Sequence, residues 1–312
     1  MIRNRCKRKR TYLKLIFCGA LIFLQLLPSN AQYSPNAELK AASQLYDKQQ
    51  HDQAFVAVNA LLRRCPQLAG ALVLRAKLYN TNGKYDMALA DEKRAEALTP
   101  DTYGLYDAMG STYSEIKQYD KALAAYSNAI KQDPTNKDMY HRRSMTYSSL
   151  NQFDKAISDL SMYLKLDPTK AVGYFWRGSC YEHNQQYPEA LADYSRAIQM
   201  NPHKFECRYV RAHLYCKLKN WQKAVNDYTS IITASPMDDD ALIKRADCYT
   251  HMGMYEKALK DMNEAISASP DFGSSVYFTR AILYDKLGKK ELAARDRAKA
   301  SEMEKRPAEG KI

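Results

Sequence analysis

Proline recurs every 34 residues through most of this chain. With 11 prolines in 312 residues, six successive repetitions of one spacing lie far outside chance. A period of 34 residues has the length of two helices, a turn and a break, and such a repeat buries its apolar face only by stacking on its neighbours. The spacing therefore predicts an all-α solenoid of helix pairs. The periodic prolines are Pro66, Pro100, Pro134, Pro168, Pro202, Pro236 and Pro270.

Residues between these prolines recur in register when each proline is counted as position 32 of its repeat. Position 8 is small, position 11 is tyrosine in six of the first seven repeats, position 20 is always alanine and position 21 is large and apolar. These positions form one helical stripe before the middle of the repeat and another after it, so we expect two packed helices, A and B. Gly83, Asn151 and Gly253 at position 15 fit a left-handed residue that ends helix A.

The pattern extends over eight repeats. The last repeat follows a one-residue insertion, and its second helix carries Lys290 and Ser301 where most earlier repeats have apolar side chains. This polar helix is expected to cap the solenoid. We expect a short segment at 32–34, repeats at 35–68, 69–102, 103–136, 137–170, 171–204, 205–238, 239–272 and 274–307, and a tail at 308–312.

This pattern of small, aromatic, alanine and proline positions over residues 35–307 resembles the tetratricopeptide repeat (TPR) family. The resemblance implies a right-handed superhelix of antiparallel helix pairs whose A helices line a concave groove that holds a protein or peptide segment. Glu92 and Glu96 depart from the pattern in repeat 2. Leu39 and Ser43 stand where chaperone-binding relatives need lysine and asparagine, so capture of an acidic chaperone tail is not implied.

Residues 1–31 do not belong to the repeats. Seven basic residues and no acidic one accompany an apolar run at 15–27, and small residues precede a break after Ala31. This order predicts a secretory signal peptide, with Gln32 as the new N-terminus. The apolar run is shorter than the roughly 20 residues that span a bilayer. An uncleaved anchor is the alternative, and only then would the chain contact a membrane. We expect export to a bacterial periplasm or the extracellular space.

The predicted signal peptide also accounts for most of the positive charge. The chain has 47 basic and 35 acidic residues, net +12, and removing the seven basic residues of the signal leaves 40 against 35, net +5. A net charge of this size is ordinary for a protein of this length, so the sequence gives no support for nucleic-acid binding.

Two positions change together across the repeats. Position 7 is arginine and position 23 is aspartate in the same six repeats, whereas the other two have Ala41 with Ala57 and Met109 with Ala125. These positions lie at matching heights in an antiparallel hairpin, so we predict structural ion pairs between helices A and B; shared ancestry without contact is the alternative. The pairs are Arg75 and Asp91, Arg143 and Asp159, Arg177 and Asp193, Arg211 and Asp227, Arg245 and Asp261, and Arg280 and Asp296.

A second stripe of helix A, at positions 2, 5, 9, 12 and 13, is placed in the groove by the resemblance. At position 5 the later repeats carry large side chains, which suits an apolar shelf for a partner segment. The competing interpretation is that these side chains are half-buried against neighbouring helices. The candidate partner-binding residues are His141, Phe175, Trp176, Tyr209, His213, Ile243 and Phe278.

The five cysteines after the signal give no regular disulfide or metal motif. Cys207 and Cys216 share a helix but point to opposite sides, which leaves Cys216 with Cys180 or Cys248 of a flanking repeat as the pairing to check. The remaining cysteine is Cys65.

Known catalytic and phosphate-binding motifs are absent from the sequence, and its histidines in the groove columns lie in different repeats. We therefore predict a non-enzymatic scaffold with no cofactor, metal or small-molecule substrate, which binds a protein or peptide. The competing hypothesis is a structural or assembly subunit of a larger cell-envelope complex that uses the convex face or the ends of the solenoid.

Overall fold

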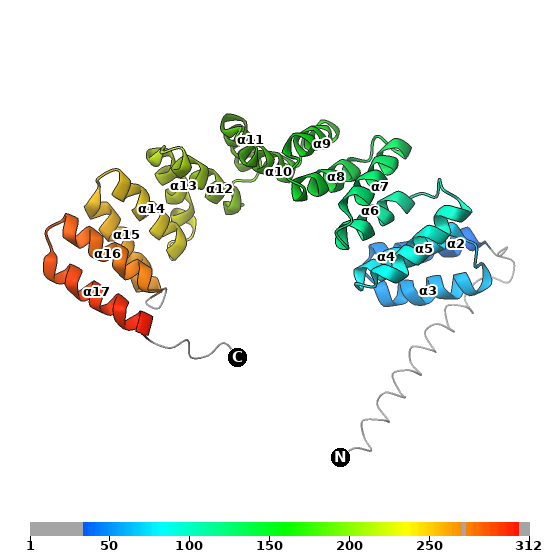
Figure 1. Ribbon diagram of the computed structural model, residues 1–312, viewed down its shortest axis with the longest axis horizontal. Coiled ribbons are helices and arrows are strands. Elements are labelled where there is room, and N and C mark those ends of the chain that lie inside the picture. The colour runs from blue at the N-terminus through cyan, green and yellow to red at the C-terminus, as the bar shows by residue number, and fades with distance from the viewer. Residues whose placement is uncertain (1–33, 270–272, 306–312) are drawn as a thin grey trace, which may run out of the picture. The chain divides into compact units, whose positions relative to one another are not determined.

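The computed structural model describes residues 34–269 and 273–305. The predicted signal peptide therefore lies outside the described residues. The described residues form sixteen helices and no strand, in the all-α arrangement expected from the repeat spacing. Consecutive helices run as antiparallel pairs (Figure 1).

The chain divides into two compact parts, with the boundary between Ala108 and Met109 inside α6 (Leu105–Glu115). The first part holds two complete helix pairs. These are α2 (Pro35–Asp47) with α3 (His51–Arg64), and α4 (Ala69–Thr81) with α5 (Tyr85–Leu98).

The second part continues from α6 through the last six repeats. Its further helices alternate along the chain, with B helices odd-numbered and A helices even-numbered. They are α7 (Tyr119–Gln132), α8 (Lys137–Ser149), α9 (Phe153–Leu166), α10 (Ala171–His183), α11 (Tyr187–Met200), α12 (Phe205–Lys217), α13 (Trp221–Ala234), α14 (Asp239–His251), α15 (Tyr255–Ala268), α16 (Ser274–Lys286) and α17 (Lys290–Lys305).

In the later repeats each A helix packs on the B helix of its own repeat and on the B helix before it. The small residue at position 8 makes the first of these contacts possible. A Cβ added to Gly178 of α10 would lie 2.9 Å from the ring of Tyr194 in α11, and one added to Gly110 of α6 would lie 2.5 Å from Tyr126 in α7. In these two repeats glycine therefore leaves room for the tyrosine at position 24, whereas repeat 6 packs Ala212 and Tyr228 in one core cluster.

The turn between helices A and B has the same backbone conformation in all eight repeats. Position 15 has φ between 56° and 72° in each of them, although it is glycine in only three. The amide N–H of the next residue donates to the carbonyl of position 11, as from Gln186 to Tyr181 at 2.8 Å, which closes the last turn of helix A. The left-handed residues are Gln49, Gly83, Lys117, Asn151, Gln185, Lys219, Gly253 and Gly288.

Helix B ends two residues before the periodic proline. The residue directly before the proline is extended, as at Asp167 with φ −144° and ψ 87° and at Thr99 with φ −154° and ψ 92°. Proline disfavours the helical conformation in its predecessor, which explains why each of these helices stops there.

The last helix, α17, buries little of its length. Its buried residues are Ala293, Asp296 and Ala300, and Leu292 is exposed. A polar helix of this kind suits the end of a helical array.

Candidate functional site

Six arginines at position 7 join helix A to helix B within their own repeats. In each pair the guanidinium Nε and Nη2 donate to the two carboxylate oxygens of the aspartate at position 23, at 2.6–2.9 Å. The side chains are 14–21% exposed for the arginines and 4–9% for the aspartates. Two parallel bonds of this kind fix both side chains, unlike a loose surface pair.

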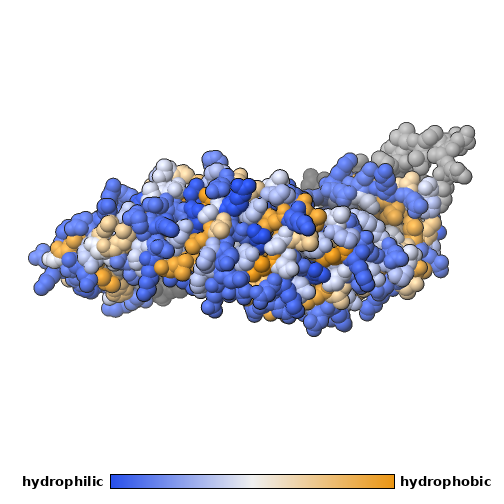
Figure 2. Space-filling view, turned by 90° about the horizontal axis from the view of Figure 1, so that it is seen from above, coloured by the Kyte–Doolittle hydropathy of each residue, from blue (hydrophilic) through white to orange (hydrophobic). Residues whose placement is uncertain are grey.

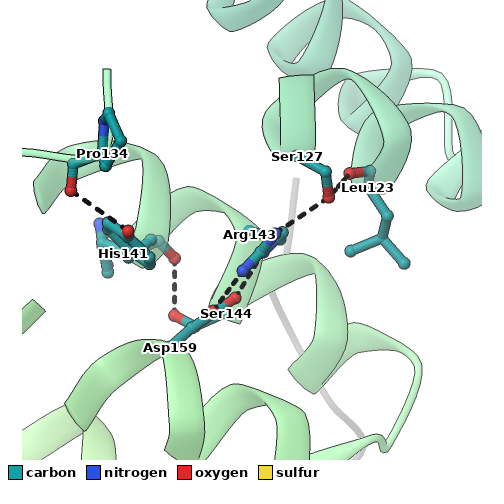
Figure 3. Close-up of polar contacts among 8 residues, drawn as sticks. Leu123, Ser127, Pro134, His141, Arg143, Ser144 and Asp159 are labelled. Carbon is teal, nitrogen blue, oxygen red and sulfur yellow. Dashed lines mark hydrogen bonds and ion pairs between the residues drawn. The ribbon is translucent and has the colours of Figure 1, made fainter. Parts of the chain in front are cut away.

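The same arginines also reach the preceding repeat. Nη1 of Arg177 donates to Ser161 Oγ at 3.1 Å, and Nη1 of Arg143 donates to Ser127 Oγ at 3.0 Å. Ser127 Oγ in turn donates to the carbonyl of Leu123, as Figure 3 shows. Each arginine therefore links helix B of one repeat to both helices of the next.

This third partner, at position 25, was missed by the sequence analysis. A small hydroxyl or amide side chain occupies it before every repeat that has the arginine, and its distance from Nη1 is 2.8–3.1 Å. Before Met109, which replaces the arginine, position 25 is Lys93. The six partners are Asn59, Ser127, Ser161, Ser195, Thr229 and Asn263.

The tyrosines at position 11 lie next to these guanidinium groups. The guanidinium carbon is 5.7–5.9 Å from the ring centre in all six repeats, as for Arg177 over Tyr181. The hydrogen bond to Asp193 is the largest cause of the raised pKa of Arg177. The arginine thus stays charged and is held from several sides.

The candidate groove residues lie on the A helices of repeats 4 to 8, which we call the helix-A column. At its start the rings of His141 and Trp176 stack, with centroids 3.7 Å apart. Burial, with a further contribution from the charge of Arg142, lowers the pKa of His141. The rings of Trp176 and Tyr163 of α9 also pack edge to face.

The next members of the column are held by the core on one side. Phe175 packs with Tyr194 and the cluster around Leu214. Tyr209 donates from its hydroxyl to Asp238 Oδ1, and its ring meets Tyr228. Ile243 and Phe278 are half-buried as well. The interpretation of position 5 as a half-buried packing position therefore describes these side chains, which remain partly exposed.

At position 9 three of the five repeats expose their side chains, whereas Ser179 and Asp247 are half-buried. His213 is exposed, Met145 is 58% exposed and Ile282 is 51% exposed. Among the described residues, Met145 and Ile282 are the exposed large hydrophobic side chains that lie on A helices. On the face drawn in Figure 2, hydrophobic residues form several small groups separated by hydrophilic ones.

Cys180, Cys207, Cys216 and Cys248 are in no disulfide, and the structure distinguishes the two pairings left open by the sequence. Cys216 lies beside Cys248, with the sulfurs 3.3 Å apart, whereas Cys180 lies beside Ser148. Within residues 34–269 and 273–305, no group of three or more His, Cys, Asp or Glu side chains is arranged to hold a metal, and no helix is long and apolar enough to cross a membrane.

Comparisons with known proteins agree with this repeat architecture. The family described as "Psidin, N-terminal TPR repeats region" matches residues 39–182, and the family described as tetratricopeptide repeat matches residues 171–204 and 239–272. The search of curated proteins gave no match.

Similar solved structures share the fold at low sequence identity. The C-terminal part of a TPR repeat-containing protein from Cytophaga hutchinsonii has a TM-score of 0.66 at 20% identity, covering 75% of this chain and 96% of its own. A tetratricopeptide repeat protein from Parabacteroides merdae has a TM-score of 0.54 at 23% identity, covering 75% and 93%. The MamA protein has a TM-score of 0.51 at 24% identity, covering 55% and 94%. With its repeat spacing, its helix pairs and these family matches, the chain is a tetratricopeptide repeat protein.

Proposed function

We propose that this protein is an exported, non-enzymatic scaffold that binds a protein or peptide segment along the helix-A column of repeats 4 to 8. The observation that carries the proposal is the coincidence of exposed apolar side chains at position 9 with half-buried aromatic residues beside them. Met145 and Ile282 present apolar surface to solvent at the two ends of this column, and His213 lies between them in sequence.

The packing of the column favours binding. Trp176 is fixed by its stack on His141, and Tyr209 by its hydrogen bond to Asp238. Side chains that are already ordered lose little conformational entropy when a partner binds. Tryptophan and tyrosine are also enriched among the few residues that dominate the binding energy of an interface.

The hydrogen bonds of the arginines to the preceding repeat support the same proposal, because they join the repeats that carry the column. Arg177, Arg211 and Arg245 connect successive repeats through Ser161, Ser195 and Thr229. Because each link joins two repeats, it limits how far neighbouring A helices can shift. A partner segment that contacts several repeats requires such a fixed spacing.

Site-specific photo-crosslinking tests the location of the binding surface. A photoreactive amino acid is placed at Met145, His213 or Ile282 in the column, and at Asn226 or Lys260 on exposed positions of the B helices. We expect the column positions to crosslink a partner protein in the native host, and the B-helix positions to give none.

The competing hypothesis, an assembly subunit that uses other surfaces, predicts the opposite pattern. Crosslinks from Asn226 or Lys260, with none from the column, would show that the B helices form the binding surface and the helix-A column does not. Exposed apolar residues on the B helices, such as Leu166 and Leu292, would then be the first to examine.

Export is a separate part of the proposal, and it rests on the sequence of residues 1–31. The basic start, the short apolar run and the small residues before Ala31 have the order of a secretory signal. N-terminal sequencing of the protein recovered from its host tests this. Gln32 as the first residue is expected, and a chain that begins at Met1 would show that the segment is kept.

A further inference from the structure

Two thiols meet at the junction of repeats 6 and 7. Cys216 lies in the last turn of α12 and Cys248 in α14, and their sulfurs are 3.3 Å apart. Both belong to one core cluster, in which Cys248 is only 1% exposed and Cys216 is half-buried.

The contact follows from the repeat register, because position 12 of one repeat faces position 10 of the next. The equivalent residues of repeats 4 and 5 are Ser148 and Cys180, whose side-chain oxygen and sulfur are 3.4 Å apart. Both pairs are separated by 32 residues in the chain. The later junction therefore carries a dithiol where the earlier one carries a hydroxyl and a thiol.

The two thiols differ in accessibility and in acidity. Hydrogen bonding from Cys248 and from the hydroxyl of Tyr228 lowers the pKa of Cys216 despite its partial burial. The hydrogen bond to Cys216, with burial, raises the pKa of Cys248. The more exposed sulfur is thus also the one that ionises more readily, and a thiolate is the form that attacks a disulfide.

We propose that Cys216 and Cys248 form a disulfide that ties helix A of repeat 6 to helix A of repeat 7. The oxidant is a disulfide, either a small molecule or a thiol–disulfide exchange protein. The Cys216 thiolate attacks one sulfur of the oxidant, forms a mixed disulfide and releases the other sulfur as a thiolate. Cys248 then loses its proton to solvent and attacks the Cys216 sulfur, which expels the second thiolate. The two cysteines give up two protons and two electrons, and the oxidant becomes a dithiol or two thiols.

The geometry suits this bond after a small movement. Because a disulfide is about 2.05 Å long, the sulfurs must approach by roughly 1.2 Å from their separation of 3.3 Å. The bond would close a chain segment that includes all of α13 and would restrict the unfolded state. An oxidising compartment outside the cytosol is where such a bond persists.

Peptide mapping tests the proposal. The purified full-length chain is treated with oxidised glutathione, free thiols are blocked under denaturing conditions, and tryptic peptides are analysed by mass spectrometry. We expect the peptides 212–217 and 246–257 to appear linked, and to separate after reduction. We also expect the melting temperature to rise by several degrees on oxidation, about 5–10 °C for one disulfide of this loop length.

Matched variants separate a native pair from incidental oxidation. Cys216→Ser should fold, as judged by its circular dichroism spectrum, and should lose both the link and the oxidation-dependent melting shift. Ser148→Cys should add a second link to Cys180, because it places a thiol in the same register.

Three results would overturn the proposal. They are a glutathione adduct on Cys216 without a link, a link from Cys216 to a cysteine other than Cys248, and an unlinked wild-type chain under conditions that oxidise exposed thiols. An unlinked wild type beside a linked Ser148→Cys variant would show that the register permits the bond but that this junction does not form it.

Discussion

Repeats 3 and 5 form the same kind of helix pair with different chemistry at positions 7 and 23. Repeat 5 joins its helices through Arg177 and Asp193, whereas repeat 3 has Met109 and Ala125, both buried. In both repeats position 8 is a glycine, and an added Cβ would lie less than 3.0 Å from the ring of a tyrosine in helix B. The helix pair therefore does not require the ion pair, since apolar residues fill the same space.

The difference lies in the third bond of the arginine. Arg177 Nη1 donates to Ser161 of the preceding repeat, and a methionine at this position has no such donor. Repeat 3 is also the repeat within which the chain divides into two compact parts. We infer that the arginine matters most for coupling successive repeats.

Removing only the carboxylate should have the largest effect. Asp193→Ala leaves the guanidinium of Arg177, whose side chain is 21% exposed, without its charged partner. Leaving a charge unpaired in such a site costs about 3–5 kcal/mol in the free energy of unfolding. Urea unfolding followed by circular dichroism measures the loss.

The double variant Arg177→Met with Asp193→Ala is the matched control, because it gives repeat 5 the residues of repeat 3. It should recover most of the stability lost in Asp193→Ala. If the single variant is as stable as wild type, the pair contributes little and the comparison between the repeats fails.

Filling the close contact at position 8 should affect both repeats alike. Gly178→Val and Gly110→Val drive a branched side chain into Tyr194 or Tyr126, at an expected cost of about 2–3 kcal/mol each. Thermal unfolding provides the measurement. Ala246→Val, which faces the flexible Met262, should cost clearly less. Equal costs at all three sites would mean that the tyrosines are not the cause.

Removing the hydrogen bond between two repeats should reduce stability by a smaller amount. The loss should occur before repeat 5, which has the arginine, and not before repeat 3, which lacks it. Ser161→Ala removes the acceptor of Arg177 Nη1 and should cost about 1 kcal/mol. Lys93→Ala changes the same position before repeat 3 and should be neutral within about 0.5 kcal/mol. Urea midpoints of the two variants decide the point, and an equal loss in both would remove the proposed coupling role.

The smallest expected effect is a gain at the turn between the helices. Gln185 and Lys117 both have a φ of 60°, which is unfavourable for residues with a side chain. Gln185→Gly and Lys117→Gly should each raise the free energy of unfolding by about 0.5–1 kcal/mol. The neighbours Gln186 and Gln118 have φ near −87° and −86°, so their glycine variants should give no gain. A gain in the neighbours would point to a cause other than the left-handed turn.

The sequence predicted the architecture because the repeats are regular. The 34-residue spacing located the helix pairs, and the joint changes at positions 7 and 23 predicted contacts that the structure contains, such as that of Arg177 with Asp193. The left-handed turn was predicted only where Gly83, Asn151 or Gly253 reveals it. At Gln185 the residue type carries no such signal, and the conformation is imposed by the packing of the helices.

The contacts between repeats were harder to predict. The role of Ser161 depends on a residue in another repeat, because a hydroxyl or amide at position 25 accompanies the arginine at position 7 of the next repeat. How far Phe175 or Tyr209 is exposed also depends on which neighbouring side chains cover its ring, and column numbers alone do not contain that information.

The most direct test of the account is the affinity for the partner that the crosslinks identify. Binding is measured by titration calorimetry for wild type, for Met145→Ala with His213→Ala and Ile282→Ala in the helix-A column, and for Leu166→Ala with Leu292→Ala on the B helices. All of these side chains are exposed, so melting temperatures should stay unchanged. We predict at least a tenfold loss of affinity, about 1.4 kcal/mol, for the column variant and wild-type affinity for the B-helix variant. The reverse result would contradict recognition by the column.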